Sequence, residues 1–298
     1  MNQAQNELIK SGMVALVGPP NVGKSTLLNV LLGQKISIVS PKPQTTRNRI
    51  LGIINGEGYQ IVMLDTPGLQ KGTIPLNVEM AKIARETLGE VDIIIFMVDA
   101  STPAPKIGSD LAECLTGRKT PAILLINKMD LLRREKLLPL IEAYQGLHEF
   151  AAIIPISALR SEGPEQLLAE LVRMLPEGPR YFPDDLPTDA SVRFIAAEII
   201  REKVFLLTGE EIPYSTAVVI DRFKEDDSLV TIDATIIIEK DSQKGMVIGK
   251  KGSKLKAIGT AARLDIEELV QGKVMLKLWV KVKKNWTKNA SFLKELGF

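Results

Sequence analysis

Residues 18–25 read GPPNVGKS, directly after the apolar run MVALV (13–17) and directly before TLLNVLLG (26–33), which has the pattern of a helix. This spacing matches G-x-x-x-x-G-K-S, a loop whose backbone N–H groups and following helix N-terminus surround phosphate groups. In such a loop Lys24 contacts the β- and γ-phosphates and Ser25 binds Mg²⁺ through its hydroxyl. The sequence therefore predicts a nucleoside triphosphate site, formed by Gly18, Pro19, Pro20, Asn21, Val22, Gly23, Lys24, Ser25 and Thr26.

Three further motifs indicate which base is bound, and each follows a buried-strand candidate. The carboxylate of Asp130, in Asn127-Lys128-Met129-Asp130, can accept hydrogen bonds from guanine N1–H and the 2-amino group, where adenine presents an acceptor. A backbone N–H of Ser157-Ala158-Leu159 can meet the guanine 6-oxo group. In Asp65-Thr66-Pro67-Gly68, Asp65 suits a water-mediated Mg²⁺ contact and the Gly68 N–H suits contact with the γ-phosphate. Together the motifs predict binding of GTP and GDP with Mg²⁺ at the edge where strands of an open α/β sheet end.

The first 178 residues alternate short apolar runs with amphipathic stretches. Five runs are expected as buried strands: MVALVG, YQIVMLD, VDIIIFMVD, PAILLIN and AAIIPIS. This alternation predicts an α/β domain with a doubly wound, mostly parallel sheet covered by helices. Two extended runs around NGEG (55–58) predict an antiparallel hairpin at one edge of that sheet.

A proline-rich acidic stretch (176–189) breaks this pattern, so we expect a linker at 179–192 and a smaller α+β domain at 193–298. Its expected order is helix, two strands, the turn GKKG (249–252), helical sequence, and a strand over KVMLKLWVKV. Residues 184–239 have a net charge of −8 and residues 240–284 a net charge of +8, which favours an anionic partner for the second stretch.

GKKG matches the G-x-x-G loop that clamps single-stranded nucleic acid in KH domains, and the element order is that of a type II KH domain. Predicted RNA contacts are Val247, Ile248, Gly249, Lys250, Lys251, Gly252, Lys254, Leu255 and Lys256, with Ile258 also lining the groove. A tight turn with surface lysines is the alternative. Trp279, in an alternating strand, is expected in the core, and Trp286 is left undecided.

The composition and the N-terminal sequence argue against several classes of protein. The single cysteine, Cys114, excludes an internal disulfide and a cysteine-based metal site, and the single histidine, His148, argues against a His-ligated zinc centre. Neither residue is assigned a role. The N-terminus lacks the pattern of a signal peptide, and the longest apolar run is too short to cross a bilayer. We expect a cytoplasmic protein.

The ordered motifs resemble those of translation-factor-class P-loop GTPases, a class in which a threonine closes over Mg²⁺ and the γ-phosphate. PQTTRNR (43–49) supplies that threonine, with Thr46 favoured and Thr45 the rival, and residues 40–49 and 68–80 correspond to the two nucleotide-sensing switches. Ras-like relatives place a water-orienting glutamine after DxxG, but this chain has Leu69 there, followed by Gln70. The resemblance implies catalytic roles for Lys24, Thr46, Gly68 and Asn21. Asn21 is implied because similar GTPases with asparagine at that position hold a K⁺ ion.

Across nearly the whole chain, QTTRNRILGI, DTPGLQK and VIGKKGSKLKAIGTAAR resemble the bacterial Era family. That resemblance implies a GTP-hydrolysing switch that binds the 3′ end of small-subunit (16S) rRNA and acts in assembly of the 30S ribosomal subunit. Some members associate peripherally with the inner membrane, although no amphipathic anchor is evident here. Two alternatives stay open: a non-hydrolysing RNA-binding assembly factor, and a GTPase whose C-terminal domain binds protein.

Overall fold

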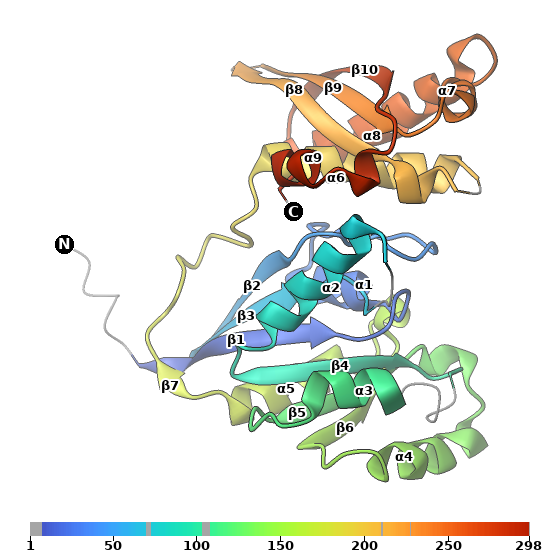
Figure 1. Ribbon diagram of the computed structural model, residues 1–298. Helices are drawn as coiled ribbons and strands as arrows, with labels where there is room; N and C mark the ends of the chain where they lie inside the picture. The colour runs from blue at the N-terminus through green and yellow to red at the C-terminus, as the bar shows by residue number, and fades with distance from the viewer. Residues whose placement is uncertain (1–7, 70–72, 103–107, 210, 227, 298) are drawn as a thin grey trace. The chain divides into compact units, whose positions relative to one another are not determined.

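A computed structural model describes residues 8–69, 73–102, 108–209, 211–226 and 228–297 of the chain. Contacts divide the chain into two units (Figure 1). Unit 1 comprises residues 1–37, 46–71 and 80–189, and unit 2 comprises residues 38–45, 72–79 and 190–298. The short segments 38–45 and 72–79 therefore group with the C-terminal unit, and not with their neighbours in sequence.

Unit 1 is built on a mainly parallel sheet with strand order β2-β3-β1-β4-β5-β6. Strand β1 pairs in parallel with both β3 and β4, β4 with β5, and β5 with β6, while β2 and β3 form an antiparallel hairpin. A short strand, β7, pairs with the start of β1. The strands are β1 (Ile9–Val17), β2 (Ile50–Gly56), β3 (Tyr59–Asp65), β4 (Ile93–Asp99), β5 (Ala122–Asn127), β6 (Ala152–Pro155) and β7 (Glu177–Gly178). All five predicted strands and the edge hairpin are confirmed, but β6, at the end of the sheet, is buried only at Ile154.

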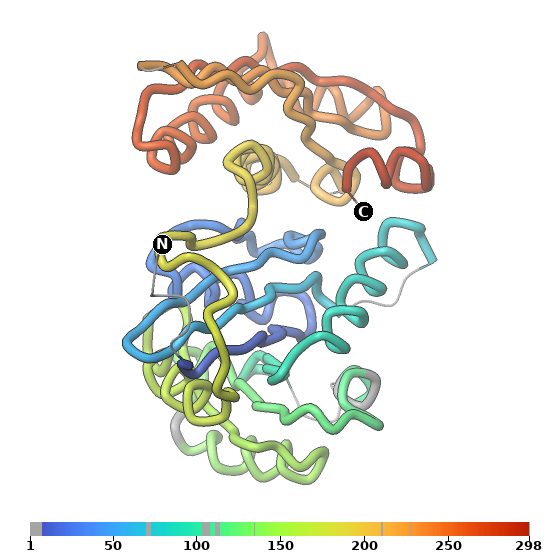
Figure 2. Tube along the Cα trace, turned by 90° about the vertical axis from the view of Figure 1, so that its left-hand side faces the viewer, coloured from blue at the N-terminus to red at the C-terminus, as the bar shows by residue number. Residues whose placement is uncertain are grey.

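Helices lie on both faces of this sheet, as Figures 1 and 2 show together. They are α1 (Lys24–Leu32), α2 (Pro75–Thr87), α3 (Gly108–Leu115), α4 (Leu137–Gln145) and α5 (Pro164–Met174). The central strand β5 is buried along its whole length and β4 is buried up to Val98, which is why their residues before Asp99 and Asn127 are apolar without alternation. This is the predicted α/β architecture, and the loops after β1, β3, β5 and β6 meet at one edge of the sheet.

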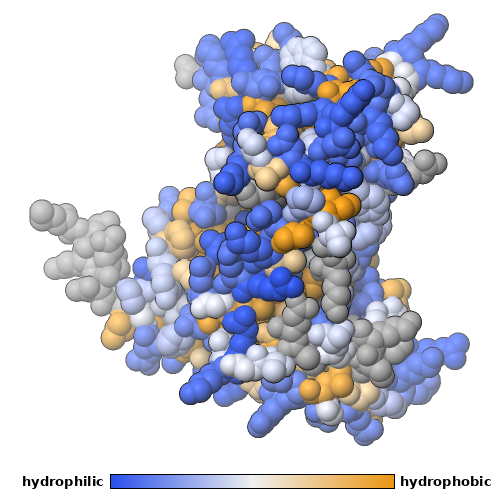
Figure 3. All heavy atoms as spheres, in the orientation of Figure 1, coloured by the Kyte–Doolittle hydropathy of each residue, from blue (hydrophilic) through white to orange (hydrophobic). Residues whose placement is uncertain are grey.

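Unit 2 has a three-stranded sheet of order β10-β9-β8, in which β8 and β9 are antiparallel and β9 and β10 are parallel. Helices pack on one face of the sheet, and Figure 2 shows α6 end-on beneath the strands. The elements are α6 (Val192–Leu207), β8 (Ala217–Asp226), β9 (Leu229–Ile238), α7 (Asp241–Ile248), α8 (Ser253–Val270), β10 (Lys273–Val282) and α9 (Ala290–Glu295). In the view of Figure 3, hydrophilic side chains cover most of the surface.

Helix α7 corrects the expected element order, which placed GKKG directly after the second strand of this unit. The segment DSQKGMVI contains Gly245 and has little amphipathic character, so its sequence signal for a helix is weak. The helix is stabilised at its start, where the side chain of Gln243 accepts the backbone N–H of Lys240 at 3.0 Å. It ends at Gly249.

The two tryptophans have opposite environments, and the expectation for Trp279 is wrong. Trp286 is fully buried, its Nε1 donates to the carbonyl of Ser215 at 2.9 Å, and its ring lies edge-on to Phe292. Trp279 is 49% exposed. It shares its side of β10 with Lys277 and Lys281, whereas Leu276, Leu278 and Val280 face the helices.

Replacing Trp286 by alanine should destabilise unit 2 by about 3–5 kcal/mol, because the substitution leaves a large cavity and an unpaired carbonyl at Ser215. The matched control, Trp279→Ala, should cost about 1 kcal/mol or less because its side chain is half exposed. Urea unfolding combined with hydrogen exchange of the β8, β9 and β10 amides measures both. Similar losses for the two variants would contradict the assigned environments.

Candidate nucleotide site and nucleic-acid groove

The loop of residues 18–23 leaves the carboxyl end of β1 and enters α1 at Lys24, the context that a phosphate-binding loop requires. The Lys24 side chain is buried, and its Nζ donates to the carbonyls of Gly18 at 3.1 Å and Pro19 at 3.0 Å. Burial lowers the pKa of Lys24 to about 8, although the nearby Asp65 carboxylate acts in the opposite direction. A cation is thus held against the inner side of the loop, where phosphate groups would lie.

Three oxygen-bearing side chains meet beside Lys24. The Ser25 Oγ lies 2.7 Å from the Thr46 Oγ1 and donates to Asp65 Oδ2 at 2.6 Å. Asp65 is fully buried, and its Oδ1 has no hydrogen-bond partner. Burial raises the pKa of Asp65, while the charge of Lys24 and hydrogen bonds from Ser25, Ser37 and Thr46 oppose that rise. An unpartnered buried carboxylate oxygen next to two hydroxyls fits a hard divalent cation such as Mg²⁺.

The structure also separates the two threonines that the sequence left open. Thr46 directs its hydroxyl to the Ser25–Asp65 cluster. Thr45 instead donates its hydroxyl to the carbonyl of Lys42 at 2.7 Å. The arrangement therefore favours Thr46 over Thr45 as the threonine whose hydroxyl would contact Mg²⁺.

Above pH of about 8, nucleotide binding should take up a proton. Phosphate charges favour the ammonium form of Lys24 and raise its pKa above the value of about 8 that burial produces. GDP affinity should then fall by up to roughly tenfold for each pH unit above that value. Calorimetry of GDP binding between pH 7 and 9, below the range in which guanine N1–H ionises, in buffers of different ionisation enthalpy, measures the proton uptake. A Lys24→Arg variant should show none, and affinity independent of pH in the wild type would contradict the assignment.

The Asp65–Gly68 segment packs directly against the phosphate loop. Gly68 has no room for a side chain, because a Cβ there would lie 2.8 Å from the Cα of Pro20. Thr66 donates its hydroxyl to the carbonyl of Leu16 at 2.9 Å, and the backbone N–H of Leu69 donates to the carbonyl of Gly18 at 3.1 Å. The Leu69 side chain packs against the core of unit 1, so it cannot orient a water molecule. Gln70 lies outside the described residues.

Asn127, at the carboxyl end of β5, joins two of the predicted motifs to each other. Its Nδ2 donates to the carbonyl of Val22 in the phosphate loop at 2.7 Å, and its Oδ1 accepts the backbone N–H of Ala158 at 2.9 Å. The side chain is almost completely buried. Asn127 therefore fixes the spacing between the phosphate end and the base end of the site.

The base end is completed by Asp130 and Ser157, where the Ser157 hydroxyl donates to Asp130 Oδ1 at 2.6 Å. This bond orients the carboxylate that the sequence assigns to guanine. Thr26 lies in the first turn of α1. The other predicted positions lie in the same loops: Pro19, Pro20, Asn21, Gly23, Pro67, Lys128 and Leu159, the last with 81% of its surface exposed.

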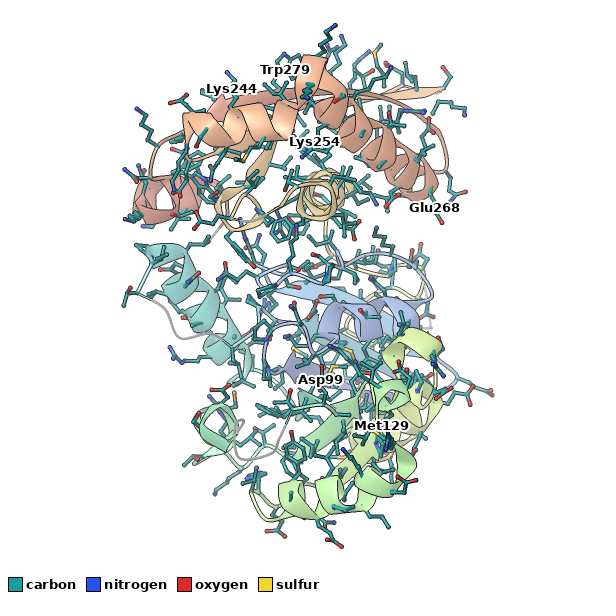
Figure 4. All side chains as sticks on the ribbon, turned by 90° about the vertical axis from the view of Figure 1, so that its right-hand side faces the viewer. Asp99, Met129, Lys244, Lys254, Glu268 and Trp279 are labelled. Carbon is teal, nitrogen blue, oxygen red and sulfur yellow. The ribbon has the colours of Figure 1, made fainter. Side chains whose placement is uncertain are left out.

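Sequence reasoning missed two residues that support the site. Asp99, at the carboxyl end of β4, forms an ion pair with Lys128 at 2.7 Å (Figure 4 labels Asp99 and Met129). Burial alone would raise the pKa of Asp99, but hydrogen bonds from Lys128 and Ser101 lower it. Ser37, fully buried, donates to Asp65 at 2.9 Å. The signal for Asp99 was present, because it follows a buried strand just as Asp65 and Asn127 do.

The GKKG turn of unit 2 connects α7 to the 18-residue helix α8. Gly249 has φ +73°, and a Cβ there would lie 2.8 Å from the Cβ of Lys254, so only glycine fits this turn. Lys250 and Lys251 are both exposed. The turn thus presents two cations beside the N-terminus of α8, a suitable arrangement for phosphate groups.

A groove with a volume of about 390 Å³ runs from this turn along α8 and β10. It is lined by Gly252, Leu255, Lys256, Gly259, Thr260, Arg263, Leu276 and Leu278. Gly252, Leu255 and Lys256 are among the predicted RNA contacts. Val247 and Ile258 are instead fully buried in the core, and Arg263, Leu276 and Leu278 were not foreseen. Apolar walls with a basic rim suit the bases and phosphates of a single strand.

Two family models match these two parts of the chain: a 50S ribosome-binding GTPase model over residues 13–128 and a KH domain model over residues 211–287. A GTPase Era from Syntrophus aciditrophicus is 52% identical over 293 residues, covering 98% of this chain and 96% of that protein. The chain belongs to the GTPase Era family. It is accordingly a GTPase, and GTPase Era of Geobacter metallireducens, 50% identical over 97% of the chain, is a further relative.

Two solved Era structures match this Era family member over 97% of its length and 99% of theirs, each with a TM-score of 0.94. One, 41% identical, is Era in complex with MgGDPNP and nucleotides 1506–1542 of 16S ribosomal RNA. The other, 42% identical, is a variant of Aquifex aeolicus Era bound to GDP and AlF₄⁻. The expected fold class, a P-loop GTPase domain followed by a KH domain, is confirmed.

Proposed function

We propose that this Era family member binds GTP and Mg²⁺ in unit 1, binds the 3′ end of small-subunit rRNA in the groove of unit 2, and acts in assembly of the 30S subunit. The observation that carries the proposal is the full-length similarity to an Era structure that holds both a GTP analogue with Mg²⁺ and the 3′ segment of 16S rRNA. The alternative of a protein without hydrolytic activity is set aside by membership of a GTPase family.

In the nucleotide site, Ser25 and Thr46 would hold Mg²⁺ through their hydroxyls, with Asp65 contributing through its unpartnered oxygen. When bound, Mg²⁺ neutralises charge on the β- and γ-phosphates. Lys24 stabilises negative charge on the same groups, and the Gly68 N–H contacts the γ-phosphate. Asp130 and the backbone at Ala158 select guanine. These roles are supported by the convergence of the four motifs at one sheet edge.

The route by which water is activated is a separate proposal, because the Leu69 side chain packs into the core. Asn21 lies in the phosphate loop with φ +62°, a left-handed conformation that asparagine tolerates. We propose that it helps hold a K⁺ ion near the bridge between the β- and γ-phosphates. Equal turnover in KCl and NaCl at matched ionic strength would rule this out.

Coupling between nucleotide and RNA is supported by the backbone at residues 45 and 46. Within unit 2, the Arg201 guanidinium donates to the carbonyl of Thr45. Lys42 Nζ donates to the carbonyl of Phe205, in the last turn of α6, and to that of Thr208, which caps this helix. Within unit 1, the next residue, Thr46, contacts Ser25. A nucleotide-dependent change at Thr46 would therefore act on a segment anchored to helix α6. Such coupling is reciprocal, so RNA should alter GTP affinity as well.

A labelled fragment of the small-subunit rRNA 3′ end, titrated with the full chain, tests the proposal. The fragment should bind more tightly with a non-hydrolysable GTP analogue than with GDP. The Lys250→Asp/Lys251→Asp double variant should bind at least tenfold more weakly, since each substitution replaces a cation by an anion at the phosphate-binding turn. Lys119→Asp, at an exposed lysine of unit 1, is the matched control.

Each outcome has a distinct meaning. Binding that ignores the nucleotide would leave the RNA assignment intact and remove the switch. RNA binding unaffected by the double variant, or no binding at all, would favour a C-terminal unit that recognises protein.

Peripheral membrane association and a cytoplasmic location stay predictions. Among the residues that the structure describes, each helix is too short or too polar to span a bilayer. Sedimentation with anionic lipid vesicles tests the peripheral association.

A further inference from the structure

The face of the unit 2 sheet that points away from the helices has an exposed tryptophan among basic side chains. On β10 the side chains at alternate positions, Lys273, Met275, Lys277, Trp279 and Lys281, are all exposed. Trp279 is 49% exposed and Met275 is 43% exposed. An exposed indole on a strand offers a flat aromatic face on which a base of a single-stranded nucleic acid can stack. We refer to these five positions and their neighbours on β9 and β8 as the outer face.

Neighbouring strands add further charge to the outer face. In the sheet register, Trp279 lies beside Thr235 and Lys277 beside Asp233, while Arg222 of β8 lies opposite Asp233. The basic members of the face are Lys273, Lys277, Lys281, Arg222 and Lys224, and the acidic members are Asp221, Asp226 and Asp233. Asp226 is paired with Lys224 at 2.7 Å, and Asp221 accepts a hydrogen bond from the Thr235 hydroxyl at 2.6 Å. Cations therefore predominate around Trp279.

The same strand has a different role on its other side. Leu276 and Leu278 line the groove that begins at GKKG, and Leu278 directly precedes Trp279. β10 is an edge strand, since the sheet order is β10-β9-β8. Figure 4 labels Trp279 on β10 and Lys254 at the start of α8. The groove lies on one side of β10 and the outer face on the other. Among the described residues no further strand lies beyond β10, so a bound nucleic-acid strand can pass around this edge from one surface to the other.

We propose that the outer face binds single-stranded RNA, as a continuation of the strand held in the groove. A base stacks on the Trp279 indole, and the flanking lysines of β10 neutralise its phosphates, the combination by which proteins bind single strands without reading their sequence. The inference rests on the proposed RNA-binding function and extends it. Charge decides between partners: Trp279 and Met275, the exposed apolar side chains of this face, alternate with Lys273, Lys277 and Lys281 along β10, which suits RNA better than a protein surface.

The chain has a built-in reporter for this contact. It has two tryptophans, and Trp286 has no exposed surface, so a base that stacks on the protein can quench only Trp279. Single-stranded RNAs from the small-subunit rRNA 3′ end, from about 4 nucleotides, enough for the groove, to about 12 nucleotides, would be titrated into the full chain. Emission should fall only with the longer RNAs.

Variants separate stacking from charge. Trp279→Ala should weaken binding of the 12-nucleotide RNA by roughly 5- to 150-fold and leave the 4-nucleotide RNA unchanged. Trp279→Phe, which keeps an aromatic face, should preserve affinity and abolish the emission change. Lys277→Glu should weaken the long RNA and reduce the salt dependence of its binding, whereas Lys119→Glu, the control in unit 1, should not.

The outcomes distinguish this inference from the function on which it rests. Unchanged emission on saturation with the long RNA, or the same loss of affinity at both lengths in Trp279→Ala, would overturn the outer face as an RNA site. If that happens while binding remains sensitive to Lys250→Asp/Lys251→Asp, the groove assignment stands. If wild type binds neither RNA, the proposed function fails, and the inference fails with it.

Discussion

Replacing Lys24 by alanine should lower the kcat for GTP hydrolysis by roughly 10²- to 10³-fold, the usual loss when one preorganised electrostatic group is removed from an active site. The position of the Lys24 ammonium group accounts for this expected loss. Lys24 is buried within the phosphate loop, held by the carbonyls of Gly18 and Pro19, and it has an unpartnered Asp65 oxygen nearby. Beside the Mg²⁺ and K⁺ ions proposed above, Lys24 is the cationic side chain that the loop itself places where charge develops on the phosphates.

Single-turnover hydrolysis and GDP binding, measured separately, show whether the loss lies in chemistry or in affinity. Lys119→Ala, at an exposed lysine of the same unit, is the control and should keep wild-type turnover. Circular dichroism checks that the variant is folded. A turnover within tenfold of wild type in folded Lys24→Ala would contradict the role assigned to the ammonium group.

Replacing Asp130 by asparagine should weaken GTP binding by roughly 10²- to 10⁴-fold, since two hydrogen bonds to a charged acceptor are lost and the amide group faces a base donor. The Ser157 hydroxyl, 2.6 Å from Asp130 Oδ1, holds the side chain in one orientation and limits its ability to turn away. Xanthine presents an oxygen where guanine has its 2-amino group. Xanthosine triphosphate should therefore regain much of the affinity that GTP loses.

Competition between GTP and xanthosine triphosphate for a fluorescent nucleotide measures this exchange of preference. Glu142→Gln, an exposed acid-to-amide change on α4, should leave both affinities as in wild type. Loss of binding for both nucleotides would indicate a collapsed loop, and retention of GTP preference would show that Asp130 does not read the base.

The nucleotide site was predictable because each motif follows a buried strand, and parallel strands deliver their carboxyl ends to one edge. Motif spacing alone could not choose between Thr45 and Thr46, since neighbouring residues in a loop have similar local sequence. Only the three-dimensional path shows which hydroxyl reaches Ser25. Likewise, Ser37 contributes to Asp65 from a loop that has no recognisable pattern.

In unit 2 the errors have two physical origins. Helix α7 was missed because its intrinsic preference is weak and its formation depends on the Gln243 side chain and on packing. Trp279 was assigned to the core because it lies in an alternating strand, although it shares its side of that strand with Lys277 and lies on the side opposite to Leu278, which already indicated the solvent side. Which alternate positions of the strand a residue shares predicted its exposure better than the hydrophobicity of its own side chain.

The alternation along β10 has a further consequence, for insertions and deletions. Because neighbouring side chains point to opposite faces, adding or removing one residue before Leu276 would exchange the apolar lining of the groove for lysines and turn the leucines to solvent. Both surfaces would be lost although none of the side chains that form them is replaced. A substitution on one face of β10 leaves the other face intact. The side chains of the groove and of the outer face can therefore change independently, whereas the number of residues in β10 cannot change without affecting both.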